Sequence, residues 1–141
     1  MVVELKEYES AEEISEHLDE QISGVKSILG EYLRRLDDIR ALAERSKKIR
    51  EMVFKLAGKK GGENTLGEIN IGDLNVILDA GPFHELTAIE KVVRSQQDRL
   101  SLLQKAREAL KWLDEVEETE GIKYLVVEKD GAPERILLKI S

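Results

Sequence analysis

The sequence predicts a mainly α-helical protein with small β elements, built on two long antiparallel coiled-coil helices. Three observations predict this class: apolar residues recur at helical spacing over two long segments, short alternating segments surround Gly-containing turns, and Gly-rich or Gly-Pro stretches separate these segments. We expect a single helical-hairpin domain over residues 1–141, with helices at about 10–57 and 82–120 and hairpins at about 66–79 and 122–140.

The first helix begins with a capping box at Ser10-Ala11-Glu12-Glu13. The Ser10 hydroxyl can accept a hydrogen bond from the amide of Glu13, and the Glu13 carboxylate can reach back to the amide of Ser10. Helical periodicity then continues for about 48 residues and ends at Gly58, after a basic last turn.

The apolar residues of this helix follow two repeats. In the first part they recur every eleven residues, as in Ile14, Val25 and Leu36, which favours a straight or slightly right-handed supercoil. The later spacing is closer to a heptad. Further apolar residues widen the stripe, so we expect more than one neighbour to cover it. Gly24 and Gly30 lie within the pattern, and each lowers the stability of the helix by about 1 kcal/mol relative to alanine. They mark either a bend in the helix or a close approach of another element.

The Gly-rich stretch 58–62 breaks the chain as a loop, because its glycines and lysines lack the spacing of a phosphate-binding loop. Apolar and polar residues then alternate on either side of Gly72-Asp73, which predicts a hairpin with these two residues in a type II′ turn. One face of this hairpin is apolar. An isolated hairpin is marginal in water, so that face needs cover from another element.

Gly81-Pro82 opens the second helix, because a proline at the first helical position lacks only an amide that would be unpaired. A three-four heptad follows, with a second apolar stripe beside it, so this helix also has more apolar surface than one partner can bury. Trp112 can be either a core side chain or the anchor of a partner. The candidate protein-interface residues are the apolar heptad positions, the tryptophan and the apolar hairpin positions: Leu86, Ile89, Val93, Leu100, Leu103, Leu110, Trp112, Ile71, Leu74, Val76 and Leu78.

The tail predicts a second hairpin. Residues 124–127 are apolar on both faces and need cover on both, residues 130–133 form the turn, and apolar residues alternate again after it. The apolar residues at positions 2, 3 and 5 could supply a third strand at its edge.

The two helices should pair antiparallel with Ala57 opposite His84. This register would bring Glu118 near Ser23 and leave roughly the first dozen residues of the first helix unpaired. The closing hairpin, about 20 Å long, would cover them and give a rod with a small sheet at each end. The main alternative is a dimer in which the long helices of two chains pair.

Charge is segregated along the chain, although the formal net charge is only −7. Residues 1–20 hold eight acids and one base, residues 34–60 hold ten bases and four acids, and residues 114–120 hold five acids. Such blocks are usually solvated helix faces. Alternatively, the basic block attracts an acidic partner, which could be the acidic start of a second copy. Nucleic acid is disfavoured by the net acidity, because neutralising phosphates supplies much of that affinity.

No recognisable catalytic motif is present. Cysteine is absent, as are G-x-S-x-G and G-x-G-x-x-G. His17 and His84 could act near neutral pH, but neither has a partner at ligand spacing, and we expect His17 to be exposed to solvent. We therefore expect no enzymatic activity, no cofactor and no metal.

The compartment follows from two absences in the sequence. Apolar runs are too short for a membrane span, and the amino terminus lacks the basic start and apolar core of a signal peptide, so we expect a cytoplasmic protein. Scarce Met and Cys with abundant Lys and Glu form the composition reported for hyperthermophiles.

A long helix, a hairpin region containing Asn75-Val76-Ile77-Leu78-Asp79-Ala80-Gly81 and a returning heptad helix follow one another over about residues 10–118. This order of elements resembles prefoldin, most closely its alpha-type subunit. The resemblance implies a cytosolic chaperone that assembles through its hairpins and grips unfolded polypeptides with its coiled-coil tips, without ATP. The chain departs from the family in having one central hairpin where the alpha type has two, and in its last hairpin, which has no counterpart.

Three functions remain open from the sequence. The first is a non-catalytic oligomeric coiled-coil protein that mediates protein-protein interaction or assembly, with a second copy of itself, a dimer first of all, or another subunit as partner. The second is a prefoldin-like ATP-independent chaperone. The third is a nucleic-acid accessory protein that uses the basic residues 34–60.

Overall fold

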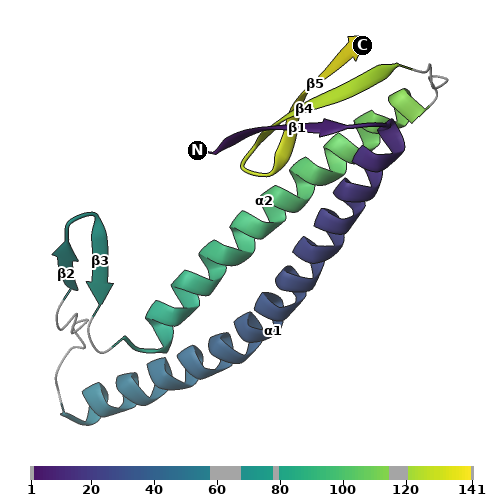
Figure 1. The fold of residues 1–141 in the computed structure, drawn as a ribbon. Coiled ribbons are helices and arrows are strands. Elements are labelled where there is room, and N and C mark those ends of the chain that lie inside the picture. The colour runs from purple at the N-terminus through teal and green to yellow at the C-terminus, as the bar shows by residue number, and fades with distance from the viewer. Residues whose placement is uncertain (1, 58–67, 78–79, 115–120, 141) are drawn as a thin grey trace. The chain divides into compact units, whose positions relative to one another are not determined.

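The computed structural model of the chain describes residues 2–57, 68–77, 80–114 and 121–140 (Figure 1). It confirms a mainly helical fold with two long helices and two small antiparallel sheets. The elements in chain order are β1 (Val3–Tyr8), α1 (Ala11–Ala57), β2 (Glu68–Ile71), β3 (Leu74–Ile77), α2 (Pro82–Asp114), β4 (Ile122–Lys129) and β5 (Ala132–Ile140). Neither helix, within the described ranges, is apolar enough over a sufficient length to cross a membrane.

The chain forms two compact units. Unit 1 comprises residues 1–30 and 94–141, and unit 2 comprises residues 31–93. The three-stranded sheet belongs to unit 1 and the β2-β3 hairpin belongs to unit 2. Each unit contains one stretch of α1 and one stretch of α2.

Both helix starts are capped by side chains. Ser10 Oγ accepts a hydrogen bond from the amide of Glu13 at 3.1 Å, as expected. The returning bond differs from the expectation, because Glu13 Oε2 accepts from the amide of Glu9, at 2.9 Å, instead of from Ser10. At the start of α2, Nδ1 of His84 accepts from the amide of Gly81 at 3.3 Å. His84 therefore fills the place that Glu or Gln takes in a capping box.

The sheet of unit 1 has the strand order β1-β4-β5 and confirms the third strand at the amino terminus. β1 runs antiparallel to β4, from Val3 opposite Lys129 to Tyr8 opposite Tyr124. The amide of Asp130 donates to the carbonyl of Val2 at 2.7 Å, and Asp130 Oδ1 accepts from the amide of Val2 at 2.9 Å. These two bonds fasten the start of β1 to the turn between β4 and β5.

The turn between β4 and β5 is shorter than expected. It consists of Asp130 and Gly131, whose φ angles of 52° and 82° correspond to a type I′ turn. Ala132 and Pro133 already belong to β5, and the register shifts at Val127/Glu128. A proline is tolerated there because it lies beside this irregularity, on a strand at the sheet edge.

The hairpin of unit 2 follows its expected geometry. Ile71 pairs with Leu74, so only Gly72 and Asp73 form the loop. Gly72 has a φ of 62°, whereas Asp130 is the one non-glycine residue in the described ranges with a positive φ. A positive φ at the first loop position alone is the type II′ pattern, which confirms the predicted turn.

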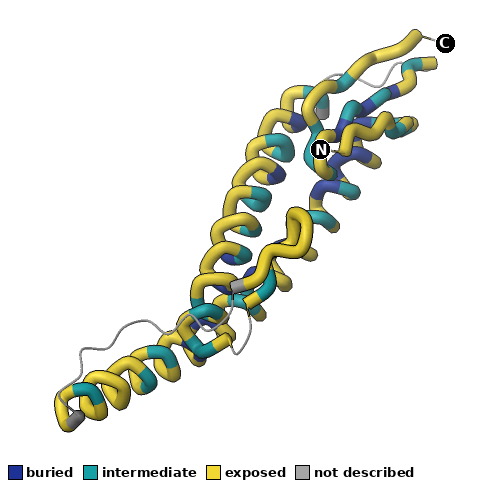
Figure 2. Tube along the Cα trace, turned by 90° about the vertical axis from the view of Figure 1, so that its left-hand side faces the viewer, coloured by how far each residue is buried: buried dark blue, intermediate teal, exposed yellow. Residues whose placement is uncertain are grey.

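The core of unit 1 lies between the sheet and both helices (Figure 2). Its members are buried apolar residues from α1, α2 and the inner face of β4: Ala11, Ile14, Leu18, Val25, Leu103, Leu110, Tyr124 and Val126. The eleven-residue pairs Ile14/Val25 and Leu18/Leu29 are all buried, as that repeat implied. Gly24 and Gly30 do not mark a close approach of another element to α1, since a β-carbon at either position would meet no atom within 4 Å.

The expected register of the helices is wrong. In unit 1, Nε of Arg107 lies 2.9 Å from Oδ1 of Asp19, whereas the expected register placed Arg107 opposite Arg34. In unit 2, Nη2 of Arg35 lies 3.6 Å from Oε1 of Glu85. The helices are therefore offset from the expected pairing by about four turns in unit 1 and about six in unit 2.

The length of the connection between the helices permits this offset. The expectation assumed that α2 starts opposite the end of α1. Residues 58–81 join the helices, and these 24 residues are long enough for the chain to return along α1 before α2 begins. Because Glu85 lies opposite Arg35, Pro82 lies opposite about Asp38. The unpaired part of α1 is thus its carboxyl-terminal end, not its first dozen residues.

Candidate interaction surfaces

The heptad residues of α2 are covered by the chain itself. Leu103 is 0% exposed, and Ile89, Val93 and Leu110 are also buried. Leu86 and Leu100 are half-buried. The four buried side chains offer no surface to another molecule while the chain is folded, so they act as core residues.

Trp112 is exposed near the end of α2, with 76% of its surface accessible. It thus lies outside the core, and its role as an anchor for a partner stays a prediction. Leu102, on the same helix, is 57% exposed.

The apolar face of the β2-β3 hairpin is open. Cross-strand partners share a face, so Ile69, Ile71, Leu74 and Val76 lie together on one side. Ile71 and Leu74 are about two-thirds exposed, and Val76 is half-buried. Leu78, the remaining predicted interface residue, lies outside the described residues. The sequence predicted that another element must cover this apolar face, and no element in the described part of the chain does so.

A second open apolar surface lies on residues 40–57 of α1, which we call the distal segment. Ile39 is the last buried residue of α1. Beyond it Phe54 is half-buried, whereas five large apolar side chains of the distal segment are at least half exposed: Leu42 51%, Ile49 57%, Met52 64%, Val53 56% and Leu56 86%. Figure 2 shows this end of α1 mostly in the colour of exposed residues, with no buried residue among them.

Four of these five exposed apolar residues form a narrow stripe, and Met52 lies beside it. From Ile39 the positions alternate between steps of three and four, through Leu42, Ser46, Ile49, Val53 and Leu56. This is the spacing of a coiled-coil seam. The stripe continues the one that α2 covers at Leu36 and Ile39, and it is left bare because α2 begins opposite about Asp38.

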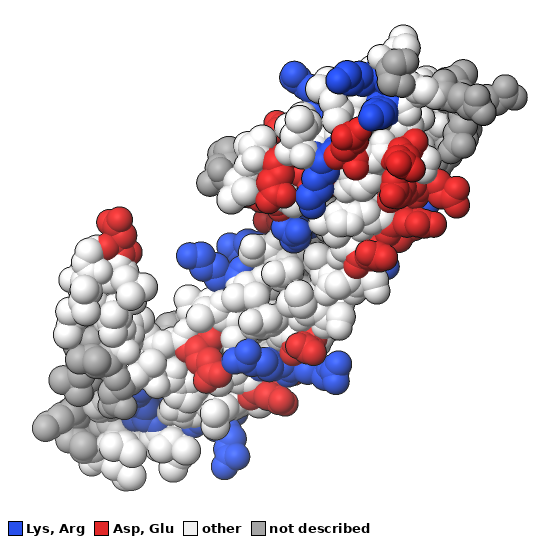
Figure 3. Space-filling view, viewed as in Figure 1, with Lys and Arg blue, Asp and Glu red and all other residues white. Residues whose placement is uncertain are grey.

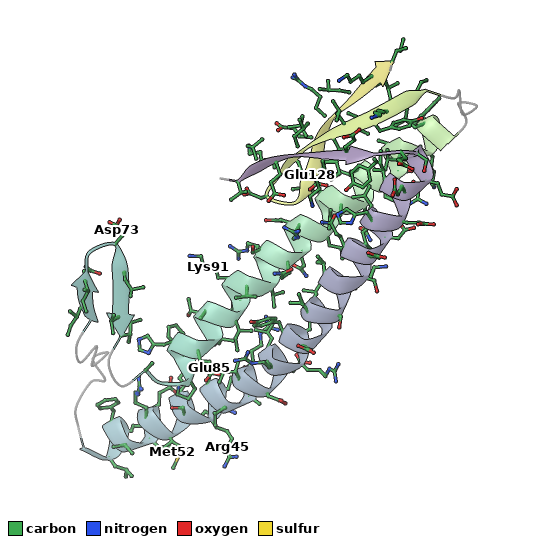
Figure 4. The ribbon with its side chains drawn as sticks, viewed as in Figure 1. Arg45, Met52, Asp73, Glu85, Lys91 and Glu128 are labelled. Carbon is green, nitrogen blue, oxygen red and sulfur yellow. The ribbon has the colours of Figure 1, made fainter. Side chains whose placement is uncertain are left out.

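One arginine lies on each flank of the stripe, in a segment rich in positive charge. The distal segment carries six bases against two acids, Glu44 and Glu51. Arg45 and Met52 lie on one flank of the stripe and Arg50 lies on the other, by helical spacing. In Figure 4 the side chains of Arg45 and Met52 point to the same side of α1. Figure 3 shows Lys and Arg beside uncharged side chains at this end, whereas acidic side chains gather over the start of α1.

Sequence reasoning singled out the α2 heptad and the hairpin but missed the distal segment. Its apolar spacing was visible, yet the expected register placed α2 beside it. The signal that could have corrected this register is the charge pattern. The expected pairing set Arg107 opposite Arg34, whereas in the observed pairing Arg107 lies beside Asp19 and Arg35 lies beside Glu85.

A buried polar group lies beneath the sheet of unit 1. The Glu128 side chain is 2% exposed, and its Oε2 lies 3.1 Å from Nζ of Lys6 (Figure 4). The hydroxyl of Tyr8 donates to Oε1 at 3.4 Å, and the Tyr8 ring lies 5.9 Å from the ring of His17. The sequence signal for this group was the two-residue alternation of β4, which carries the buried face from Tyr124 and Val126 to Glu128.

The histidines do not form a reactive pair. His17 is half-buried, which corrects the expectation of a solvent-exposed side chain, since the sheet and the Tyr8 ring lie over it. His84 caps α2. Among the residues that the structure describes, no three His, Asp or Glu side chains come together where they could hold a metal ion.

Comparison of the chain with protein-family models, with curated proteins and with solved structures finds no match.

Proposed function

We propose that this protein is a non-catalytic interaction or assembly protein, in which another protein chain covers the distal segment of α1. The observation that carries the proposal is the bare three-four stripe, whose members range from 51% exposed at Leu42 to 86% at Leu56. Contiguous apolar surface on a soluble protein marks an interaction site more often than scattered exposed leucines do.

The energetics support cover by protein. Fully burying a Leu, Ile, Val or Met side chain contributes roughly 1.5–3 kcal/mol, so burial of Leu42, Ile49, Val53 and Leu56, with Met52 on the flank, is a substantial driving force for association. A helical segment of this length without tertiary packing is itself marginal in water. A partner would therefore both bury the stripe and stabilise the end of α1.

The hairpin adds a second surface of the same kind. Its face of Ile69, Ile71, Leu74 and Val76 is open among the described residues, and a two-stranded hairpin needs packing on one face for independent stability. Two open apolar surfaces on unit 2 favour a protein that binds other protein chains over one that acts as a monomer.

The test is site-specific photo-cross-linking in an extract of the source cells. A photoreactive phenylalanine analogue at Ile49 should give a discrete protein adduct, and the same analogue at Ala41, which is exposed on α1 outside the stripe, should give none. An adduct of twice 16.0 kDa would identify a second copy, and another mass would identify a different subunit. No adduct from position 49, together with a mass of 16.0 kDa at all concentrations, would contradict the proposal.

The same experiment separates the alternatives. A chaperone of unfolded polypeptides would give adducts of many masses from position 49 and would suppress client aggregation without ATP. A nucleic-acid accessory protein would instead shift labelled DNA or RNA in a salt-dependent manner.

A further inference from the structure

The geometry points to one occupant for the distal segment: an amphipathic helix of another protein, with acidic residues beside its apolar stripe. This inference rests on the proposed function, and it goes further by assigning the partner's secondary structure and its charge.

A helix is the element that fits the stripe. The distal stripe has three-four spacing and continues directly from the part of α1 that already receives a helix, where Leu36 and Ile39 are buried. A narrow seam of this kind holds one helix, whereas helices that lie on a membrane surface present a broad apolar face. From Leu42 to Leu56 the stripe is about 21 Å long, so a partner helix of about four turns would cover it.

The flanks of the stripe select the partner's charge. Positions beside a coiled-coil seam face the corresponding positions of the partner helix. Arg45 occupies such a position on one side and Arg50 on the other, and both are exposed. The two acids, Glu44 and Glu51, lie on the side of α1 away from the stripe. Glu or Asp on the partner would therefore meet arginine on both flanks.

A second copy of the distal segment lacks this complementarity. In a parallel pair, Arg45 of one chain would face Arg50 of the other on both sides of the seam, because these positions differ by five residues. In an antiparallel pair, two segments with six bases and two acids each would still repel one another.

The acidic start of a second copy is also a poor occupant. Its acids surround Ile14 and Leu18, and both of these side chains are 1% exposed in the core of unit 1. A folded second copy could therefore offer only its charged surface to the stripe, not an apolar one.

The test uses two labelled 21-residue synthetic peptides with leucine at the seam positions. One carries glutamate and the other lysine at the flanking positions. Fluorescence anisotropy with the full chain should show that the acidic peptide binds at least tenfold more tightly than the basic one, and that the preference weakens as salt is raised.

Charge-reversal variants test whether the flanking arginines cause the preference for the acidic peptide. Arg45→Glu/Arg50→Glu should weaken binding of the acidic peptide about tenfold and favour the basic peptide, since two attractive pairs become repulsive. The matched control is Arg40→Glu/Lys47→Glu, which changes the net charge equally on the outer side of the helix and should keep the preference. Circular dichroism of both variants checks that the fold is retained.

Several results would overturn the inference. Equal binding of both peptides, or an equal effect of the control variant, would show that charge at the flanks does not select the partner. Binding to vesicles of phosphatidylserine and phosphatidylcholine, with no binding of the acidic peptide, would assign the stripe to a lipid surface. A dimer that Ile49→Asp dissociates, with no peptide binding, would assign the stripe to a second copy and leave the proposed function standing. A monomer that binds neither peptide and gives no adduct from position 49 would contradict both.

Discussion

The hydroxyl of Tyr8 donates a hydrogen bond to the buried carboxylate of Glu128, across 3.4 Å between β1 and β4. Burial, followed by the negative charge of Glu128, raises the pKa of Tyr8 from 10.0 to about 12. The bond joins the amino-terminal strand to the central strand, in a sheet that covers the start of α1.

This raised pKa predicts a loss of stability at alkaline pH. The folded state holds the Tyr8 proton more tightly than the unfolded state, so the contribution is complete below pH 10 and is lost as the pH rises from 10 to about 12. Urea unfolding at a series of pH values should show the free energy of unfolding falling across this window. Tyr8→Phe should flatten that part of the profile, and an unchanged slope would refute the assignment to Tyr8.

The control is Glu128→Gln. This change removes the charge and keeps the volume, so the pKa of Tyr8 should move from about 12 towards 10, while the part due to burial remains. Absorbance at the tyrosinate band follows this titration, with Tyr8→Phe as the reference for Tyr32 and Tyr124.

Adjacent leucines on α2 should respond very differently to truncation. Leu103 is 0% exposed in the core of unit 1, so Leu103→Ala should lower the free energy of unfolding by about 3 kcal/mol. Leu102 is 57% exposed, and Leu102→Ala should change it by less than about 0.5 kcal/mol. Denaturant unfolding of both variants measures the difference, and similar values would contradict the burial of Leu103 in the core of unit 1.

Gly24→Ala should stabilise the protein by about 0.5–1 kcal/mol, because Gly24 lies inside α1 and a β-carbon there meets nothing within 4 Å. The corresponding rise in melting temperature is about 3 °C.

Gly131→Ala is the contrasting variant. Gly131 has a φ of 82°, and its β-carbon would lie 2.6 Å from Nη2 of Arg99, so the substitution should destabilise by about 1–2 kcal/mol. A gain from both changes would argue against the turn between β4 and β5.

The register of the helices in unit 1 is testable through Asp19 and Arg107. A double-mutant cycle with Asp19→Asn and Arg107→Gln should give a coupling energy of about 0.3–1 kcal/mol, modest because Asp19 is 58% exposed. A cycle with Glu20→Gln in place of Asp19→Asn should give a coupling near zero. Coupling of Arg107 to Arg34, with none to Asp19, would restore the register expected from the sequence.

Much of the local structure could be predicted from the sequence because it depends on neighbours in the chain. The capping hydroxyl of Ser10, the type II′ turn at Gly72 and the proline that opens α2 each involve residues within a few positions. The β1 strand was also visible as a short apolar segment that could join the last hairpin.

The helix pairing could not be predicted in this way, because a heptad specifies a face of a helix but not how far along its neighbour it packs. Contacts between residues distant in the chain decided it, chiefly Leu103 and Leu110 against the start of α1 and Arg107 against Asp19. The same offset explains why Leu42 to Leu56 became the candidate surface while the α2 heptad became core.

The sequence by itself thus determined which segments become helices and strands, where the helices begin, and which side of each is apolar, since these properties follow from side-chain spacing and backbone preference. The tertiary structure alone decided which of those apolar sides the chain covers and which it leaves open. The physical reason is that burial depends on how two elements align, and a connection of 24 residues between α1 and α2 allows many alignments until packing and charge select one.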